Sequence, residues 1–315
     1  MKSNVNNQIN NFKKKGILKF NNVIQREKCI NLYNQLIKGR EWGPDIFRSQ
    51  KDVILNPQYK KTNPGKGISN LAEKFDLDFI EKNETILNTL NFILGEDFEI
   101  ILKKFVVAAP SFWIPGWLKD KIAVRLGTNL GPYIKEKFRD MSYFRGIDYH
   151  QDQIDFPNSE PDFVTMYVYL NDTISKSSPL HVIEKSHIYG PTKFPHFLKE
   201  VNDDYVIYGL NKNNFKKLKR KILIGNAGTA YIWSCLTLHG TKPQEDKNTI
   251  RISLRYLIKK NKKNKKKFII DKLFPTDKKV LKTRDDIDFE THKVLKTRND
   301  IDFGKLGQKK FKKNK

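Results

Sequence analysis

The sequence predicts a mainly β fold with α-helices on its N-terminal side. Three observations predict it. Two amphipathic helical patterns precede residue 96, short runs of β-branched and aromatic residues begin at about residue 98, and no long helical pattern separates these runs. Closely spaced strands without intervening helices indicate an antiparallel sandwich or barrel and exclude a βαβ sheet.

The two helical patterns lie between about residues 22 and 95. In the first, apolar side chains recur at helical spacing, Asn22 with Gln25 resembles a capping pair, and Gly39 is a plausible stop. In the second, from Asn83, the same spacing recurs and ends at Gly95. Both patterns are typical of helices packed against a sheet.

The expected core spans about residues 98–258. Its β-type runs are residues 98–109, 162–172, 178–184, 203–210, 216–225, 228–240 and 248–258. With 38% hydrophobic and 12% aromatic residues, the chain can bury enough surface to fold. We therefore expect one domain over residues 1–258.

Residues 259–315 differ in composition from the rest. They hold 21 Lys and Arg against 8 Asp and Glu, and "KVLKTRDDIDF" at 279–289 recurs as "KVLKTRNDIDF" at 293–303. Two short copies with a period of 14 residues are too few for a solenoid. We expect a solvated, mobile, Lys-rich tail that carries a local duplication.

The formal net charge of +25 favours anionic partners, because Lys and Arg that neutralise phosphates release counterions. About half of this excess lies in the tail, and a chain rich in Lys, Asn and Ile also results from a low-GC coding sequence. A small anionic substrate and a nucleic acid both remain open.

The two cysteines, Cys29 and Cys235, are far apart, so neither a disulfide framework nor a thiolate zinc site is indicated. The N-terminus lacks an apolar signal core, and no run of about 18 apolar residues appears. We expect a soluble, cytoplasmic protein without a membrane span.

The stretch "YHQDQIDF" at 149–156 places a histidine and a carboxylate two residues apart. A His-x-Asp pair arises by chance in a chain of this composition, but residues i and i+2 of a strand project to one side, so His150 and Asp152 can converge on one ion. His239, at the far end of the run 228–240, is the best third ligand. Two histidines and one carboxylate leave three positions of an octahedron open, as in non-haem Fe(II) oxygenases.

The run 248–258 alternates polar and apolar residues. Arg251, Ser253 and Arg255 share one face and aliphatic or aromatic residues the other. The polar face either meets solvent or points into a barrel cavity, where Arg251 and Ser253 would bind a carboxylate.

These residues resemble the phytanoyl-CoA dioxygenase family of Fe(II)- and 2-oxoglutarate-dependent oxygenases. The pattern comprises His150-x-Asp152, the distal His239 and Arg251-x-Ser253, with "SPLHVIEKSHIYG" at 178–190 between them. That segment keeps Leu180, Val182, Ile183, Ser186 and His187 of the family pattern but departs from it at 178–179 and 184–185, where small turn residues are usual. The resemblance covers roughly residues 16–258.

The resemblance implies a double-stranded β-helix, the cupin-like jelly roll, with Fe(II) held by His150, Asp152 and His239. The 2-oxoglutarate cosubstrate would chelate the iron and pair its far carboxylate with Arg251 and Ser253, and O2 would take the last position. Succinate and CO2 would be released as a small molecule is oxidised. The carboxylate ligand points to hydroxylation or a related oxidation, because related halogenases lack it.

Two further residues are positioned to line the cosubstrate pocket. They are Thr165, in the run 162–172, and Trp233, upstream of the distal histidine. For residues so placed, ordinary barrel packing is the commoner role.

Two other functions stay open. One is a nucleic-acid-directed protein, either an oxygenase or a binding module, that uses the basic tail. Nucleic-acid demethylases of this chemistry have a second spaced arginine, whereas Arg255 follows Arg251 by only four residues. The other is a metal-free jelly-roll binding domain, in which His150 and Asp152 coincide by chance.

Overall fold

The structure is a computed structural model of the 315-residue chain. It describes residues 2–56, 69–123, 127–156, 159–191, 196–211, 214–247, 249–273, 287–288 and 293–294. Most of the duplicated segment at 279–303 therefore lies outside the described residues.

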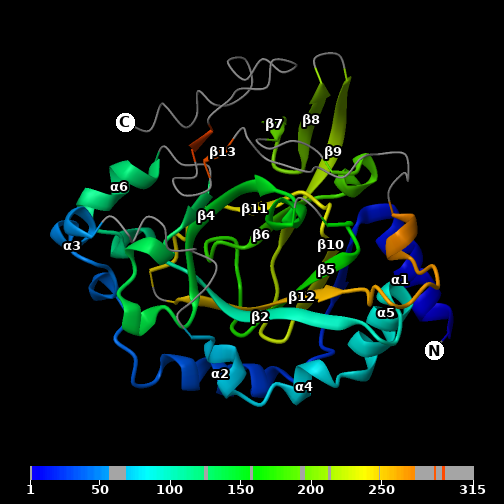
Figure 1. Cartoon of the computed structure of the whole chain (residues 1–315), viewed down its shortest axis with the longest axis horizontal. Coiled ribbons are helices and arrows are strands. Elements are labelled where there is room, and N and C mark those ends of the chain that lie inside the picture. The colour runs from blue at the N-terminus through cyan, green and yellow to red at the C-terminus, as the bar shows by residue number, and fades with distance from the viewer. Residues whose placement is uncertain are drawn as a thin grey trace.

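Six α-helices within the described residues surround a sheet (Figure 1). They are α1 (Lys2–Lys15), α2 (Arg26–Ile37), α3 (Gln50–Leu55), α4 (Asp78–Glu81), α5 (Glu84–Leu94) and α6 (Gly116–Ala123). Short 3-10 turns join them to the strands: η1 (Pro44–Ile46), η3 (Leu71–Lys74), η4 (Ser111–Trp113), η5 (Gly131–Tyr133), η6 (Glu136–Phe138), η7 (Asp152–Asp155), η8 (Ser186–Tyr189) and η9 (Ile270–Lys272).

The second predicted helix is confirmed, but the cap of the first is wrong. Helix α5 is capped by Asn83, whose side chain accepts from the Ile86 N–H, and it ends before Gly95 at φ 101°. Helix α2 begins only at Arg26, and Gln25 makes no side-chain cap. Asn22 adopts a left-handed φ of 55°, which turns the chain before the helix starts.

Twelve strands form one sheet, in the path β1-β10-β5-β12-β2-β4-β11-β6-β9-β8-β7 with β3 beside β4. The strands are β1 (Ile17–Phe20), β2 (Glu99–Ala108), β3 (Gly127–Asn129), β4 (Ser142–His150), β5 (Phe163–Tyr169), β6 (Leu180–Ile183), β7 (Phe197–Glu200), β8 (Tyr205–Asn211), β9 (Asn214–Leu223), β10 (Ala230–Ser234), β11 (His239–Thr241) and β12 (Arg251–Lys259). A separate pair is β13 (Ile287–Asp288) with β14 (Lys293–Val294).

The path contains the two four-stranded halves of a jelly roll, β10-β5-β12-β2 and β4-β11-β6-β9. Pairing along it is antiparallel except between β2 and β4, where the halves join. The chain crosses between halves at β4 to β5, β5 to β6 and β9 through β12. The predicted mainly β fold with flanking helices is thus confirmed, and its core is a jelly roll.

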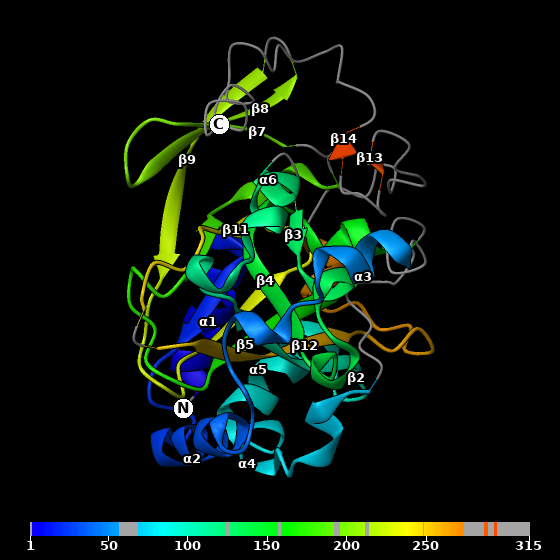
Figure 2. The ribbon, with the colours of Figure 1, turned by 90° about the vertical axis from the view of Figure 1, so that its left-hand side faces the viewer.

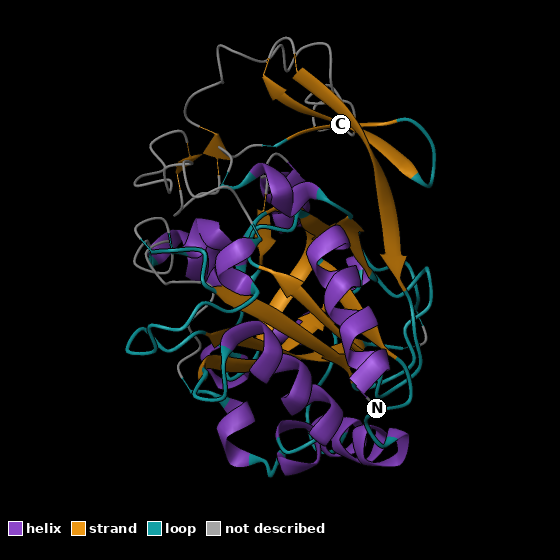
Figure 3. Cartoon of the chain, turned by 90° about the vertical axis from the view of Figure 1, so that its right-hand side faces the viewer, coloured by secondary structure: helices purple, strands orange, loops and turns teal. Residues whose placement is uncertain are grey.

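Two hydrophobic clusters show which face of each strand points into the jelly roll. One lies between helices α2, α4 and α5 and the outer faces of β2 and β12. Figure 3 shows a layer of helices below the strands. The other lies between the two halves and includes Tyr167, Tyr169, Tyr231 and Trp233. Tyr169 donates from its hydroxyl to the Leu223 carbonyl at 2.6 Å, which links β5 to β9 across the interior. Side chains on the inner faces therefore converge on one space.

Strands β8 and β9 extend beyond the rest of the sheet, as Figure 2 shows from the side. The part of these two strands that adjoins the rest of the sheet packs in a third hydrophobic cluster, which includes Val206, Tyr208 and Leu218. Of the expected tail, the described part up to residue 273 contains η9, and Ile270 and Leu273 are buried against the large cluster. No described helix combines the length and apolar composition needed to cross a bilayer.

Candidate metal centre

His150, Asp152 and His239 come together at one end of the jelly-roll interior. Each offers a ligand atom, and these atoms all lie within 4.8 Å of one another. His150 ends β4 and His239 begins β11, where the two residues are direct partners in the antiparallel register. The carboxylate comes from Asp152, the first residue of η7.

The local structure differs from the predicted one in two ways. His150 and Asp152 do not share a strand, because the chain turns into η7 after His150, and this turn brings the carboxylate back toward the histidines. His239 does not end the strand of residues 228–240. Strand β10 stops at Ser234, and His239 opens the separate strand β11.

Backbone carbonyls orient both imidazoles. His150 Nδ1 lies 2.9 Å from the Asp148 carbonyl oxygen, and His239 Nδ1 lies 2.9 Å from that of Thr237. A carbonyl can only accept, so Nδ1 carries the proton in each ring and Nε2 holds the lone pair. The ring centroids are 4.4 Å apart. Both histidines are therefore fixed in the tautomer that binds a metal through Nε2.

The Asp152 carboxylate is buried and fully engaged. Thr165 Oγ1 and Trp233 Nε1 donate to its Oδ2 at 2.6 and 3.1 Å, and Arg255 Nη2 donates to its Oδ1 at 2.5 Å. Burial by itself would raise the pKa of this carboxyl, but Arg255 and the two imidazoles outweigh burial and hold the pKa well below its usual range. Asp152 therefore remains an anion throughout the neutral range.

Burial lowers the pKa of His239 to about 4, against the opposing effect of the Asp152 charge. The imidazole is consequently neutral at pH 7, which is the form a metal ion requires. Two imidazoles with one hydrogen-bonded carboxylate are a donor set that suits Fe(II) and other first-row divalent ions.

Deeper in the same space lies a cluster that holds more hydrogen-bond donors than acceptors. Arg251 is 2% exposed, and its Nη1 donates to Tyr167 Oη at 3.1 Å and to Ser253 Oγ at 2.8 Å. Its Nε is buried without a hydrogen-bond partner. Within the described residues, no carboxylate pairs with Arg251, and neither hydroxyl donates to a protein acceptor. A buried cation flanked by two such hydroxyls is a cradle for a carboxylate.

The structure thus decides between the two interpretations of the polar face of β12. Arg251 and Ser253 are buried and face the interior, while Ile252 and Leu254 lie in the cluster beneath the helices. Thr165 and Trp233 also face this interior, where both contact Asp152. Their predicted contact with a cosubstrate stays a prediction.

Sequence reasoning missed two residues of the site. The strand pattern places Arg255 on the polar face without indicating a role in the metal centre, and it was not applied to Tyr167. The period-two pattern of residues 163–169 puts Tyr167 on the same face as Thr165, which was a usable signal. The Arg255–Asp152 ion pair joins residues 103 positions apart, so no local pattern could indicate it.

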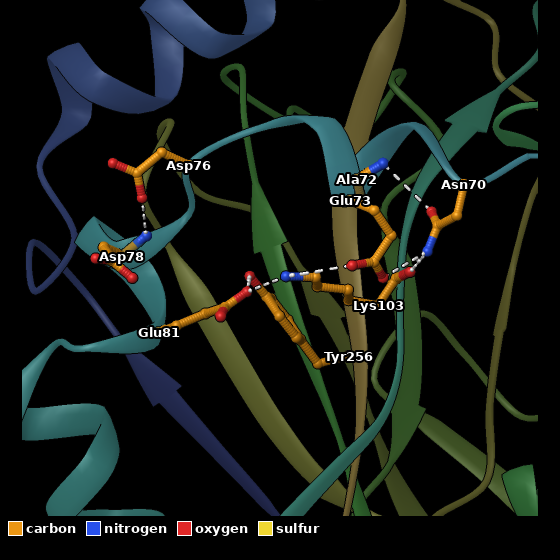
Figure 4. Close-up of polar contacts among 8 residues, drawn as sticks. All are labelled: Asn70, Ala72, Glu73, Asp76, Asp78, Glu81, Lys103 and Tyr256. Carbon is orange, nitrogen blue, oxygen red and sulfur yellow. Dashed lines mark hydrogen bonds and ion pairs between the residues drawn. The ribbon is translucent and has the colours of Figure 1, made fainter.

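Lys103 and Lys104 are neighbours on β2 whose side chains lie on opposite faces. Lys103 points outward, where its Nζ lies 3.1 Å from Glu81 Oε1 and 3.9 Å from Glu73 Oε2, as drawn in Figure 4. Lys104 points inward beside Arg255, its partner in the register. Burial, followed by the Arg255 charge, lowers the pKa of Lys104 to about 8. Carboxylates therefore pair with Lys103 on the outer face, whereas burial disfavours the charged form of Lys104 on the inner face.

Lys104→Met is expected to stabilise the metal-free protein at pH 7 by on the order of 2 kcal/mol, because the native state disfavours the ammonium form. The unfolded chain binds more protons between the folded pKa of about 8 and the ordinary lysine pKa of 10.5, so wild-type stability rises with pH across that window. The advantage of the variant should therefore shrink from pH 8 upward, as measured by urea unfolding at several pH values.

Lys103→Met is the matched control. It removes a partly exposed ion pair, so it should lower stability by about 0.5–1 kcal/mol. A loss of stability in Lys104→Met at pH 7 would contradict this description of the inner lysine.

Comparison with known proteins gives structural neighbours only. No family model matches the chain, and no curated protein matches it. The non-heme alpha ketoglutarate dependent epimerase SnoN from nogalamycin biosynthesis is 11% identical, covers 82% of this chain and 84% of its own, and has a TM-score of 0.49. AviO1 from Streptomyces viridochromogenes Tue57 is 11% identical, with coverages of 82% and 95% and a TM-score of 0.44.

EvdO2 from Micromonospora carbonacea var. aurantiaca, solved with 2-oxoglutarate, is 14% identical, with coverages of 81% and 90% and a TM-score of 0.44. Similarity at this level does not establish an activity. What the site can do follows from the side chains of this chain.

Proposed function

We propose that this protein is an Fe(II)- and 2-oxoglutarate-dependent oxygenase that hydroxylates a small molecule and releases succinate and CO2. The observation that carries the proposal is the pairing of two features in one interior. Three ligands for a divalent metal lie beside a buried guanidinium that has no carboxylate partner among the described residues. A dicarboxylate with a keto group adjoining one end fits both features at once.

The ligand set supports iron chemistry with an exchangeable cosubstrate. His150, Asp152 and His239 would hold the metal through two imidazoles and one carboxylate, a ligand set that would leave room for an exchangeable keto acid and O2. When bound, the ferrous ion would let O2 act as the oxidant, with one oxygen atom passing to succinate as the keto acid loses CO2 and the other to the hydroxylated substrate. With the residue pattern from His150 to Ser253, this chemistry favours the phytanoyl-CoA dioxygenase family.

The protein side chains perform the binding and orientation. Arg251 would pair with the far carboxylate of 2-oxoglutarate, and the Ser253 and Tyr167 hydroxyls, which already accept from Arg251, would donate their own hydrogens to it. Thr165 and Trp233 hold Oδ2 of Asp152, which fixes the direction in which the carboxylate presents Oδ1. The aromatic walls of the interior exclude water from the reacting centre.

Two measurements test the proposal: the binding of the metal and the cosubstrate first, and turnover second. Under anaerobic conditions, Fe(II) followed by 2-oxoglutarate should produce the visible charge-transfer band of a keto acid chelated to Fe(II). Admission of O2 should then convert 2-oxoglutarate to succinate, which mass spectrometry detects without knowledge of the substrate.

A further inference from the structure

We propose that one face of the sheet formed by β7, β8 and β9 binds single-stranded nucleic acid, with lysine side chains on the phosphates and aromatic rings against the bases. This face extends beyond the jelly roll, where β8 and β9 stand clear of the other strands (Figure 2). Its partner is therefore additional to the substrate and cosubstrate of the proposed oxygenase.

The strand register separates the two faces of this sheet. Leu198 pairs with Tyr208, and Val206 pairs with Leu218, and all four pack in the third hydrophobic cluster. Side chains alternate along a strand, so the residues between them point the other way. We call the side chains on this second side the lysine face, which includes Lys199, Tyr205, Phe215, Lys217, Lys219 and Lys221.

Two aromatic rings of the lysine face lie open to solvent. Tyr205 is 37% exposed and Phe215 is 45% exposed. The Lys217 ammonium lies 4.8 Å from the centroid of the Tyr205 ring, so a cation and an aromatic ring adjoin one another. Exposed rings beside cations are the arrangement on which the bases of a single strand stack.

No carboxylate compensates the charge of this face. Within the part of the chain that the structure describes, none of its four lysines forms an ion pair, and Glu200 of β7 turns to the opposite face, where it pairs with Arg220 at 2.7 Å. At the base of β9, Lys221 approaches Lys19 of β1. Burial, followed by the charge of Lys221, lowers the pKa of Lys19. Because like charges repel, an anion bound along this face is favoured.

The spacing of the lysines fits a linear polyanion. Lys217, Lys219 and Lys221 alternate along β9, so their side chains recur about every 6.6 Å on one side of the strand. Successive phosphates of an extended single strand recur on a similar length. In a duplex the bases stack on one another, so a duplex would engage the lysines but leave the rings without partners. The combination of a cationic row with exposed rings therefore favours a single strand.

The test measures binding of the full-length protein to a fluorescently labelled oligothymidylate by anisotropy, at several concentrations of sodium chloride. Replacing Lys217, Lys219 and Lys221 together by glutamine should reduce the slope of log Kd against log salt by about 2, since each phosphate contact on a single strand contributes about 0.7. Tyr205→Ala should weaken binding about fivefold or more through lost stacking, and it should leave the salt slope unchanged.

Two variants serve as matched controls. Lys216 is also exposed on β9, but it pairs with Tyr208 and so belongs to the opposite face. Lys216→Gln should therefore keep the wild-type salt slope and a Kd within about twofold of the wild type. Tyr205→Phe keeps the ring and should bind as the wild type does. Urea unfolding of each variant separates a loss of binding from a loss of folding.

The proposal is overturned if the wild type does not bind oligothymidylate, if Lys216→Gln weakens binding as much as the triple replacement, or if Tyr205→Ala binds as tightly as the wild type. Duplex DNA and vesicles of anionic phospholipid are tested in parallel. Equal affinity for duplex DNA would reduce the lysine face to a general attractor of anions. Binding to the vesicles without binding to oligothymidylate would assign the face to a membrane surface instead.

Discussion

Replacing Asp152 by alanine is expected to lower the affinity for Fe(II) or Ni(II) by at least about a hundredfold, because the site then keeps only two neutral imidazoles. The variant also loses the acceptor of three donors, from Thr165, Trp233 and Arg255, and leaves the guanidinium without its anion. Its metal-free form should consequently be less stable than the wild type by about 3 kcal/mol. Calorimetric metal titration and urea unfolding measure the two effects.

Asp155→Ala is the control for this prediction. Asp155 ends the same 3-10 turn, but it does not belong to the cluster of possible metal ligands. Its loss should change metal affinity by less than about threefold, because its charge acts only over a distance. The reverse result, with metal lost in Asp155→Ala and kept in Asp152→Ala, would show that the ligand assignment is wrong.

Replacing Arg251 by glutamine is expected to raise the Kd for 2-oxoglutarate about a hundredfold while the affinity for the metal stays within a few fold. The buried guanidinium supplies the charge that would pair with the far carboxylate, and the Ser253 and Tyr167 hydroxyls cannot replace that charge. Calorimetric titration of Ni(II)-loaded protein with 2-oxoglutarate gives the value.

Pyruvate provides the ligand control, because it has the keto acid end of 2-oxoglutarate but no second carboxylate. Wild type and Arg251→Gln should bind pyruvate equally weakly. If Arg251→Gln binds 2-oxoglutarate as tightly as the wild type, the far carboxylate is held elsewhere and the cradle has another purpose.

Features that depend on local periodicity could be predicted from the sequence. The alternation at residues 250–258 placed Arg251 and Ser253 on one face of a strand, and burial of the apolar face beneath the helices turns that polar face inward. The spacing of apolar residues before Gly95 likewise gave helix α5. In both cases a pattern of period two or 3.6 must bury one side, so the sequence determines the element.

The sequence could not predict features that depend on the direction the chain takes after a turn. The chain leaves β4 at His150 and enters η7, so the convergence of His150 with Asp152 results from a bend and not from strand alternation. Helix α1 has too few apolar residues to show a helical period in the sequence. In the structure, however, the side chains of Ile9 and Phe12 are buried, so the helix packs against the rest of the protein. The contacts of Asp152 join four segments distant in sequence, which only the assembled jelly roll brings together.

The central claim is that one interior binds both a ferrous ion and the keto acid end of 2-oxoglutarate. The most direct measurement is the visible absorption of the wild-type protein with Fe(II) under anaerobic conditions, before and after addition of 2-oxoglutarate, beside His239→Ala treated in the same way. A weak charge-transfer band should appear in the wild type only when both components are present, and it should be absent from the variant. A wild-type protein that binds no divalent metal and develops no such band would contradict the assignment.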